Sequence, residues 1–117
     1  MTESPLIVKS KTFALDVIQV CKELRVAKCE GTLINQFLRS GTSIGANIRE
    51  AFYAHGKADF IAKLQIALKE CYETEYWLEI AQKSNIISSE ATNIIFHDCG
   101  VIRRMLIASI NTAKENQ

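Results

Sequence analysis

The stretch RSGTSIGANIREA, residues 39–51, decides the fold, because it keeps helical spacing while holding residues that helices usually avoid. Around it, apolar and small residues recur at steps of three and four from about residue 32 to residue 54. Gly41 and Gly45 each cost a helix about 1 kcal/mol relative to alanine. Both glycines lie on the apolar face, where a missing side chain lets a neighbouring helix approach closely. We therefore predict close helix packing at Gly41 and Gly45, with a kink or break between two shorter helices as the alternative.

Three further segments on either side of this stretch show the same helical repeat, and short polar or glycine-containing breaks separate them. The breaks fall at Glu30-Gly31, at His55-Gly56 and in the polar run 83–89. The predicted helices span about residues 5–28, 32–54, 57–83 and 89–114. Four helices joined by short loops favour an all-α fold, an antiparallel up-down-up-down four-helix bundle. A chain of 117 residues fits a single domain over 1–117.

Several classes of function and location are disfavoured by the sequence. The N-terminus lacks the pattern of a signal peptide and no apolar run could span a bilayer, so we expect a cytoplasmic protein without a membrane partner. No Glu-x-x-His, phosphate-binding glycine loop, G-x-S-x-G or H-E-x-x-H motif occurs. We therefore predict no enzymatic activity, no catalytic residue, no cofactor and no metal. Buried free thiols are favoured over disulfides or a zinc site for the cysteines, Cys21, Cys29, Cys71 and Cys99.

The net charge is only +1, but basic residues are more frequent than acidic ones near the N-terminus. Between residues 4 and 28 the acidic residues are Asp16 and Glu23. The basic residues there are the candidate contacts to RNA or DNA, which we list as Lys9, Lys11, Lys22, Arg25 and Lys28. The alternative is that these side chains are simply solvated by water on an outer helix face and bind nothing.

A second apolar stripe on each of the last two predicted helices indicates contact with another copy of the chain. On the third helix this stripe includes Glu73, and on the fourth it surrounds Arg103, which we expect to face Glu73 across the subunit boundary. The predicted interface of the homo-oligomer consists of Ile66, Glu73, Trp77, Ile80, Phe96, Arg103, Ile107 and Ile110.

Glu75 falls on the core stripe of the third predicted helix, where a carboxylate without a partner would cost several kcal/mol. The candidate partners on the glycine-bearing helix are Arg39, Arg49 and Asn47. The alternative is that Glu75 lies near an edge and reaches water.

The runs LRSGTSIGANIREA and GKADFIAKLQIALKECYETEYWLEIA resemble the small bacterial four-helix bundle proteins encoded in intervening sequences of 23S rRNA genes. The resemblance implies an antiparallel bundle that assembles into a homopentamer. It extends distantly to the accessory variability protein of diversity-generating retroelements, which binds nucleic acid and a reverse transcriptase. Polar positions of the family map onto a predicted structural cluster between the second and third helices, formed by Arg39, Asn47, Glu50 and Glu75, together with Glu73.

The function that we expect is therefore a non-enzymatic, homo-oligomeric binding or scaffold protein with RNA or DNA as its ligand. The alternative is an adaptor that interacts only with another protein. A metal or redox enzyme is the third and least favoured class.

Overall fold

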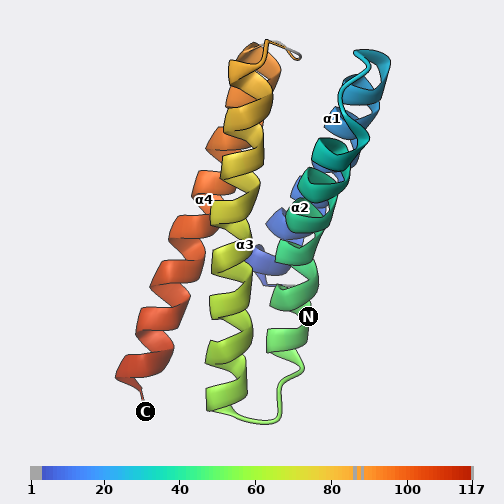
Figure 1. Ribbon diagram of the computed structural model, residues 1–117. Helices are drawn as coiled ribbons and strands as arrows, with labels where there is room; N and C mark the ends of the chain where they lie inside the picture. Colours follow the sequence, from blue (N-terminus) through green and yellow to red (C-terminus); the bar gives the residue numbers. More distant parts are fainter. Residues whose placement is uncertain (1–3, 86, 88, 117) are drawn as a thin grey trace.

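The computed structural model describes residues 4–85, 87 and 89–116, and it consists of four long helices joined by short turns (Figure 1). The helices are α1 (Pro5–Val26), α2 (Gly31–Phe52), α3 (Lys57–Lys83) and α4 (Ser89–Glu115). Successive helices run in opposite directions, so the predicted all-α antiparallel up-down-up-down bundle is confirmed. The predicted helix ends differ from those of the structure by no more than 2 residues.

Local sequence explains where the helices begin and end. The Ser4 hydroxyl accepts a hydrogen bond from the Leu6 amide at 3.3 Å, and Pro5 occupies the first turn, where its missing N–H does no harm. After α1, Lys28 takes a left-handed conformation with φ of 60°, and Asn85 does the same after α3 with φ of 58°. These two residues reverse the chain.

The core is formed by one apolar stripe from each helix. Val17 of α1, Ile44 of α2, Leu64 of α3 and Leu106 of α4 are fully buried at 0% exposure. Each helix packs against its two neighbours in the order α1, α2, α3, α4, and α1 and α4 pack least closely. Among the described residues, the backbones of the diagonal helices do not approach each other closely, so α1 and α3 present their outer surfaces to opposite sides.

The glycine stretch lies within α2, which continues as one α-helix from Gly31 to Phe52. A Cβ added at Gly41 would lie 2.8 Å from Cγ2 of Val17, and one at Gly45 would lie 3.3 Å from Oγ of Ser10. The backbone of α2 therefore approaches α1 closely at both positions. The Thr42 hydroxyl donates a hydrogen bond to the Leu38 carbonyl at 2.8 Å, which satisfies a polar group inside the helix.

At one end of the bundle α2, α3 and α4 extend beyond α1, because α1 begins at Pro5, partway along the neighbouring helices (Figure 1). Near that end, Phe52 of α2 and Phe60 of α3 meet edge to face with ring centroids 5.6 Å apart. These rings border a shallow depression of about 440 Å³, whose other lining residues all come from the last turns of α4.

Candidate functional site

The five basic residues predicted to contact nucleic acid do not form one patch, because α1 directs them to different sides. Lys9 and Lys11 are separated by about 200° of helical rotation. Lys9 lines a groove of about 340 Å³ between α1 and α4, together with Asp16 and Asp98. Lys11 lines a pocket between α1 and α2, opposite Arg49. The carboxylates beside Lys9 offset its charge, so this residue is a poor phosphate contact.

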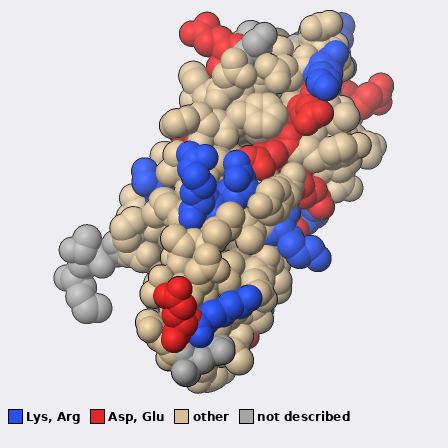
Figure 2. Space-filling model, turned by 90° about the vertical axis from the view of Figure 1, so that its left-hand side faces the viewer, with Lys and Arg blue, Asp and Glu red and all other residues tan. Residues whose placement is uncertain are grey.

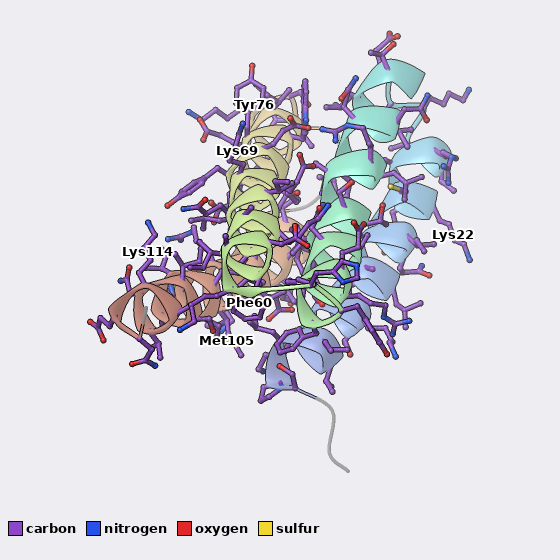
Figure 3. The ribbon with its side chains drawn as sticks, turned by 90° about the horizontal axis from the view of Figure 1, so that it is seen from below. Lys22, Phe60, Lys69, Tyr76, Met105 and Lys114 are labelled. Atoms are coloured by element: carbon purple, nitrogen blue, oxygen red, sulfur yellow. The ribbon has the colours of Figure 1, made fainter. Side chains whose placement is uncertain are left out.

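Lys11, Lys22 and Arg25 share the side of α1 that borders α2, because residues eleven and fourteen positions apart return to nearly the same direction. All three are exposed, and Lys22 points away from the bundle (Figure 3). Lys28 lies beyond the helix, in the turn that leads to α2. Arg49 was not predicted as part of this surface, although its position in the glycine stretch places it next to α1. We call Lys11, Lys22, Arg25 and Arg49 the α1–α2 basic face.

On the α1–α2 basic face, Lys22, Arg25 and Arg49 form no ion pair with another described residue. Asp16 and Glu23 of α1 are seven positions apart and lie on the α4 side. Glu50 of α2 is directed to α3, where its carboxylate lies 3.1 Å from Nζ of Lys63. Among the described residues, these three carboxylates therefore form no ion pair with Lys22, Arg25 or Arg49.

A second basic area lies on α4, where Arg103 and Arg104 both cover Gly100. A Cβ added at Gly100 would lie 3.3 Å from Nη1 of Arg104 and 3.4 Å from Nη2 of Arg103. Figure 2 faces this side and shows lysine and arginine side chains gathered near mid-length, with a row of acidic side chains beside them. The acidic neighbours distinguish this area from the α1–α2 basic face.

The predicted partner of Glu75 is corrected by the structure. Neither Arg39, Arg49 nor Asn47 pairs with it; the Glu75 carboxylate accepts a hydrogen bond from Nε of Arg103 on α4 at 3.3 Å. Burial alone would lower the pKa of the Arg103 guanidinium. The charge and the hydrogen bond of the Glu75 carboxylate outweigh this effect of burial, so the pKa of Arg103 is raised. The guanidinium also lies 5.7 Å from the centroid of the Tyr72 ring, within range of a cation–π contact.

Arg39 instead pairs with two other carboxylates of α3. Its guanidinium lies 3.1 Å from Glu70, and it also donates to Glu73. Glu73 accepts a further hydrogen bond from Nε1 of Trp77 at 3.3 Å. Within the chain, Glu73 and Arg103 thus have other partners, and their predicted contact across a subunit boundary stays a prediction.

The remaining members of the predicted polar cluster also have separate partners. Asn47 donates a hydrogen bond to the Ser43 carbonyl of its own helix at 2.9 Å, and Glu50 pairs with Lys63. The four residues therefore do not form one cluster: Arg39 and Glu50 join α2 to α3, Glu75 joins α3 to α4, and Asn47 bonds within α2. Sequence reasoning missed the buried polar contact between these helices, in which the hydroxyl oxygens of Thr74 and Ser40 lie 3.0 Å apart.

The structure divides the predicted oligomer interface between surface and core. Ile66 and Ile80 are exposed on the outer face of α3, at 42% and 38%. Trp77, Phe96 and Ile107 are half-buried, and the first two pack against the core. Ile110 is a correction, because it is only 5% exposed and belongs to the core cluster.

Two exposed aromatic residues on α3 were not predicted, Tyr72 and Tyr76, at 51% and 54% exposure. Figure 3 shows Lys69 and Tyr76 pointing away from the bundle on α3. The spacing of Tyr72 and Tyr76 relative to Ile66 and Ile80 places all four residues on the outer side of α3. A helical projection that included tyrosine would therefore have found both tyrosines. We call Ile66, Tyr72, Tyr76 and Ile80 the α3 outer stripe.

The four cysteines are free thiols, of which Cys21, Cys71 and Cys99 are buried. Sγ of Cys99 lies 3.5 Å from the Cys71 carbonyl oxygen, between α3 and α4. The neighbouring Cys71 thiol and burial raise the pKa of Cys99, and burial raises the pKa of Cys21. A raised pKa keeps a thiol protonated and a poor nucleophile. Among the described residues, no group of three or more histidine, cysteine or acidic residues is placed to bind a metal ion.

The fold and its surfaces define a class: a small antiparallel four-helix bundle with a basic face, an apolar outer stripe and a closed core. The family model of the 23S rRNA-intervening sequence protein matches residues 3–108, so the chain belongs to this family.

A solved structure supports the same assignment. It is the 1.70 Å crystal structure of a protein with unknown function from the S23 ribosomal protein family of Bacteroides thetaiotaomicron VPI-5482. The two chains are 47% identical, with a TM-score of 0.87, over 90% of this chain and 97% of the other. No curated protein matches the chain. Within the described residues, none of the helices combines the length and the apolar character that crossing a membrane requires.

Proposed function

We propose that the protein is a non-enzymatic, self-associating scaffold of the cytoplasm that binds nucleic acid through its α1–α2 basic face. The observation that carries this proposal is the gathering of Lys11, Lys22, Arg25 and Arg49 on one face, where the last three form no ion pair with another described residue. The four free thiols suit a reducing compartment.

A nearly neutral protein can bind a polyanion only through a local surface of this kind, because its net charge of +1 creates no long-range attraction. The other basic area, on α4, is a weaker candidate. Arg103 is held there by Glu75, with its side chain only 27% exposed. Phosphate would have to compete with that carboxylate, whereas Lys22, Arg25 and Arg49 form no ion pair with a described acidic residue.

Self-association would multiply this modest surface. The α3 outer stripe exposes two isoleucines and two tyrosines around Lys69 and Glu73, a composition that is typical of protein interfaces. Since α1 and α3 are diagonal in the bundle, contact through α3 leaves the α1–α2 basic face free. Several copies of a weak site on one assembly bind a long polyanion more tightly than one copy can. The family resemblance implies a homopentamer as the assembled form.

We expect light scattering to give a mass that is a multiple of 13.1 kDa, and Ile66→Glu with Ile80→Glu to reduce it to the single-chain mass. Two charges in a desolvated contact would oppose association. Trp77→Glu is a poorer test, because Trp77 packs against the core and its loss would also destabilise the fold. Circular dichroism should show unchanged helix content in the double variant. A wild-type protein that remains a single chain across the micromolar range contradicts the proposed assembly.

We expect a gel shift with structured RNA at low salt, and a clear weakening when Lys22→Glu and Arg25→Glu are combined. Both side chains are exposed, so their reversal should leave folding intact while replacing attraction to phosphate by repulsion. The matched control reverses Arg104 and Lys114, which are exposed basic residues of α4 outside the α3 outer stripe. A wild-type protein that produces no shift would exclude nucleic acid as the ligand.

The second candidate function is a protein adaptor without a nucleic-acid ligand, and the exposed aromatic residues of the α3 outer stripe favour it. Purification with and without nuclease separates the two functions. An absorbance ratio at 260 to 280 nm that is high, and that nuclease treatment lowers, favours nucleic acid. A ratio typical of pure protein under both conditions favours the adaptor.

A further inference from the structure

We infer that the pocket between α1 and α2 is a phosphodiester site, in which Lys11 and Arg49 bind one backbone phosphate of a nucleic-acid strand. The inference rests on the proposed function and assigns a specific site to it. The pocket has a volume of about 300 Å³ and opens on the α1–α2 basic face.

Small residues create this pocket. Gly45 and Ala46 of α2 lie opposite Ala14 of α1, and none of them has a side chain that could fill the space between the helices. The approach of the helices at Gly45, where an added Cβ would lie 3.3 Å from Oγ of Ser10, forms the floor. Residues with larger side chains at these positions would close the pocket.

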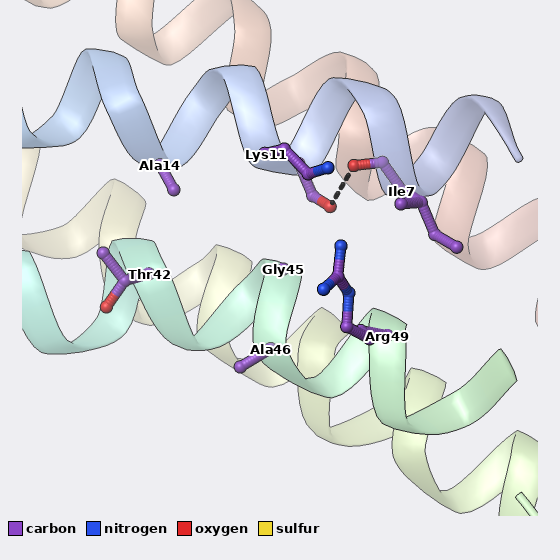
Figure 4. Close-up of a pocket in the computed structure, with 8 residues that line it drawn as sticks. Ile7, Lys11, Ala14, Thr42, Gly45, Ala46 and Arg49 are labelled. Carbon is purple, nitrogen blue, oxygen red and sulfur yellow. Dashed lines mark hydrogen bonds between the residues drawn. The ribbon is translucent and has the colours of Figure 1, made fainter. Parts of the chain in front are cut away.

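Two cationic side chains border the pocket from opposite helices. Figure 4 shows Arg49 extending from α2 across the pocket toward α1, on the side where Lys11 lies. Among the described residues, Arg49 forms no ion pair, since the neighbouring Glu50 is directed to Lys63. The Arg49 guanidinium therefore has N–H donors available to an anion in the pocket.

The hydroxyl groups in the pocket leave recognition of an anion to these cations. Ser10 donates its hydrogen bond to the Ile7 carbonyl at 3.2 Å, and Thr42 donates to the Leu38 carbonyl at 2.8 Å. Their hydrogen atoms are therefore already engaged. An arginine and a lysine are the side chains that most often bind phosphate oxygens, the first through a planar fork and the second as a point charge.

The surroundings favour a phosphodiester over free phosphate. Ile7, Ala14 and Ala46 give the pocket apolar walls, which offer nothing to an inorganic ion but can contact a sugar. Lys22 lies eleven residues beyond Lys11 on the same side of α1, about 16 Å along the helix axis. That distance spans several phosphates of one strand, so a strand seated in the pocket would also reach Lys22 and Arg25.

The test is fluorescence anisotropy with a labelled single-stranded 20-nucleotide RNA, measured over a range of salt concentrations. The pocket variant combines Lys11→Gln and Arg49→Gln, and the control combines Arg104→Gln and Lys114→Gln on α4, which removes the same charge. We expect the pocket variant to bind about 10-fold more weakly at low salt, with a log–log salt slope smaller by about 1 to 2. The control should stay within about twofold of wild type.

A third variant, Ala46→Leu, fills the pocket without changing the charge. Ala46 is exposed within a helix, so leucine should be tolerated there while RNA binding weakens. Circular dichroism and self-association should remain those of the wild type.

Wild-type binding of RNA with no loss in the pocket variant or in Ala46→Leu would overturn the pocket assignment and leave the proposed function intact. No binding of RNA by the wild type would overturn the proposed function itself. Inorganic phosphate should not displace the RNA at matched ionic strength. If it does, the pocket is a free-anion site, and the phosphodiester assignment fails.

Discussion

Gly41→Leu is expected to lower the free energy of unfolding by about 3 kcal/mol or more, since overpacking a filled core costs typically 1–3 kcal/mol and here the backbones are already in close contact. The first added carbon would lie 2.8 Å from Cγ2 and 2.9 Å from Cγ1 of Val17. Val17 is β-branched, fully buried and held by α1, so it cannot rotate away. The two helices would have to separate, which would expose apolar surface along their whole contact.

Urea denaturation monitored by circular dichroism measures this loss as a lower transition midpoint. Gly31→Leu is the matched control in the same helix, because no atom lies within 4 Å of a Cβ added there. It should leave stability unchanged or raise it slightly. Val17→Ala should partly rescue Gly41→Ala, since the clash requires both side chains. A Gly41→Leu midpoint equal to that of wild type would show that α1 does not approach α2 closely.

Arg103→Met is expected to lower the free energy of unfolding by about 2 kcal/mol, because it leaves the Glu75 carboxylate without its cationic partner. The Glu75 side chain is only 19% exposed, so water can solvate the carboxylate only in part. The variant also loses the contact of the guanidinium with the Tyr72 ring, 5.7 Å away. The loss should exceed that of an ordinary surface ion pair, which is worth about 0–1 kcal/mol.

The same denaturation experiment, with two further variants, isolates this pair. Arg104→Met changes the neighbouring exposed arginine, which forms no ion pair with any described residue, and should shift stability by no more than about 0.5 kcal/mol. Arg103→Met combined with Glu75→Met should recover most of the lost stability, since methionines can fill the space without a desolvated charge. Equal losses for Arg103→Met and Arg104→Met would contradict the role of this pair.

The helices were predictable from sequence because their signals are local. Ser4 followed by Pro5 marks a helix start, and a repeat of three and four residues continues through each segment. The sequence spacing alone places Gly41 and Gly45 on the apolar face of their helix. It also indicates that a neighbouring helix must pack against that face. None of these inferences requires knowledge of how the helices are arranged around each other.

The contacts between helices were less predictable, because they depend on which helix lies to each side of the core stripe. Spacing places Glu75 beside the core but does not distinguish the α2 side from the α4 side, and the partner proved to be Arg103 on α4. Ile110 was assigned to an outer stripe for the same reason, since the edge of the core moves with the position of the neighbouring helix. Lys9 and Lys11 were grouped by proximity in sequence, although a helix turns them to opposite sides.

The late start of α1 has a consequence for how the molecule opens. The last turns of α4 extend past the point where α1 begins. They therefore pack against fewer neighbouring helices than the first turns of α4 at the opposite end (Figure 1). Backbone amides there have less packing to break before solvent reaches them, and they should exchange hydrogen for deuterium earlier than amides near Leu106. The bundle would thus loosen from the end that lies beyond the start of α1, while the closely packed backbones around Gly41 keep α1 and α2 together until global unfolding.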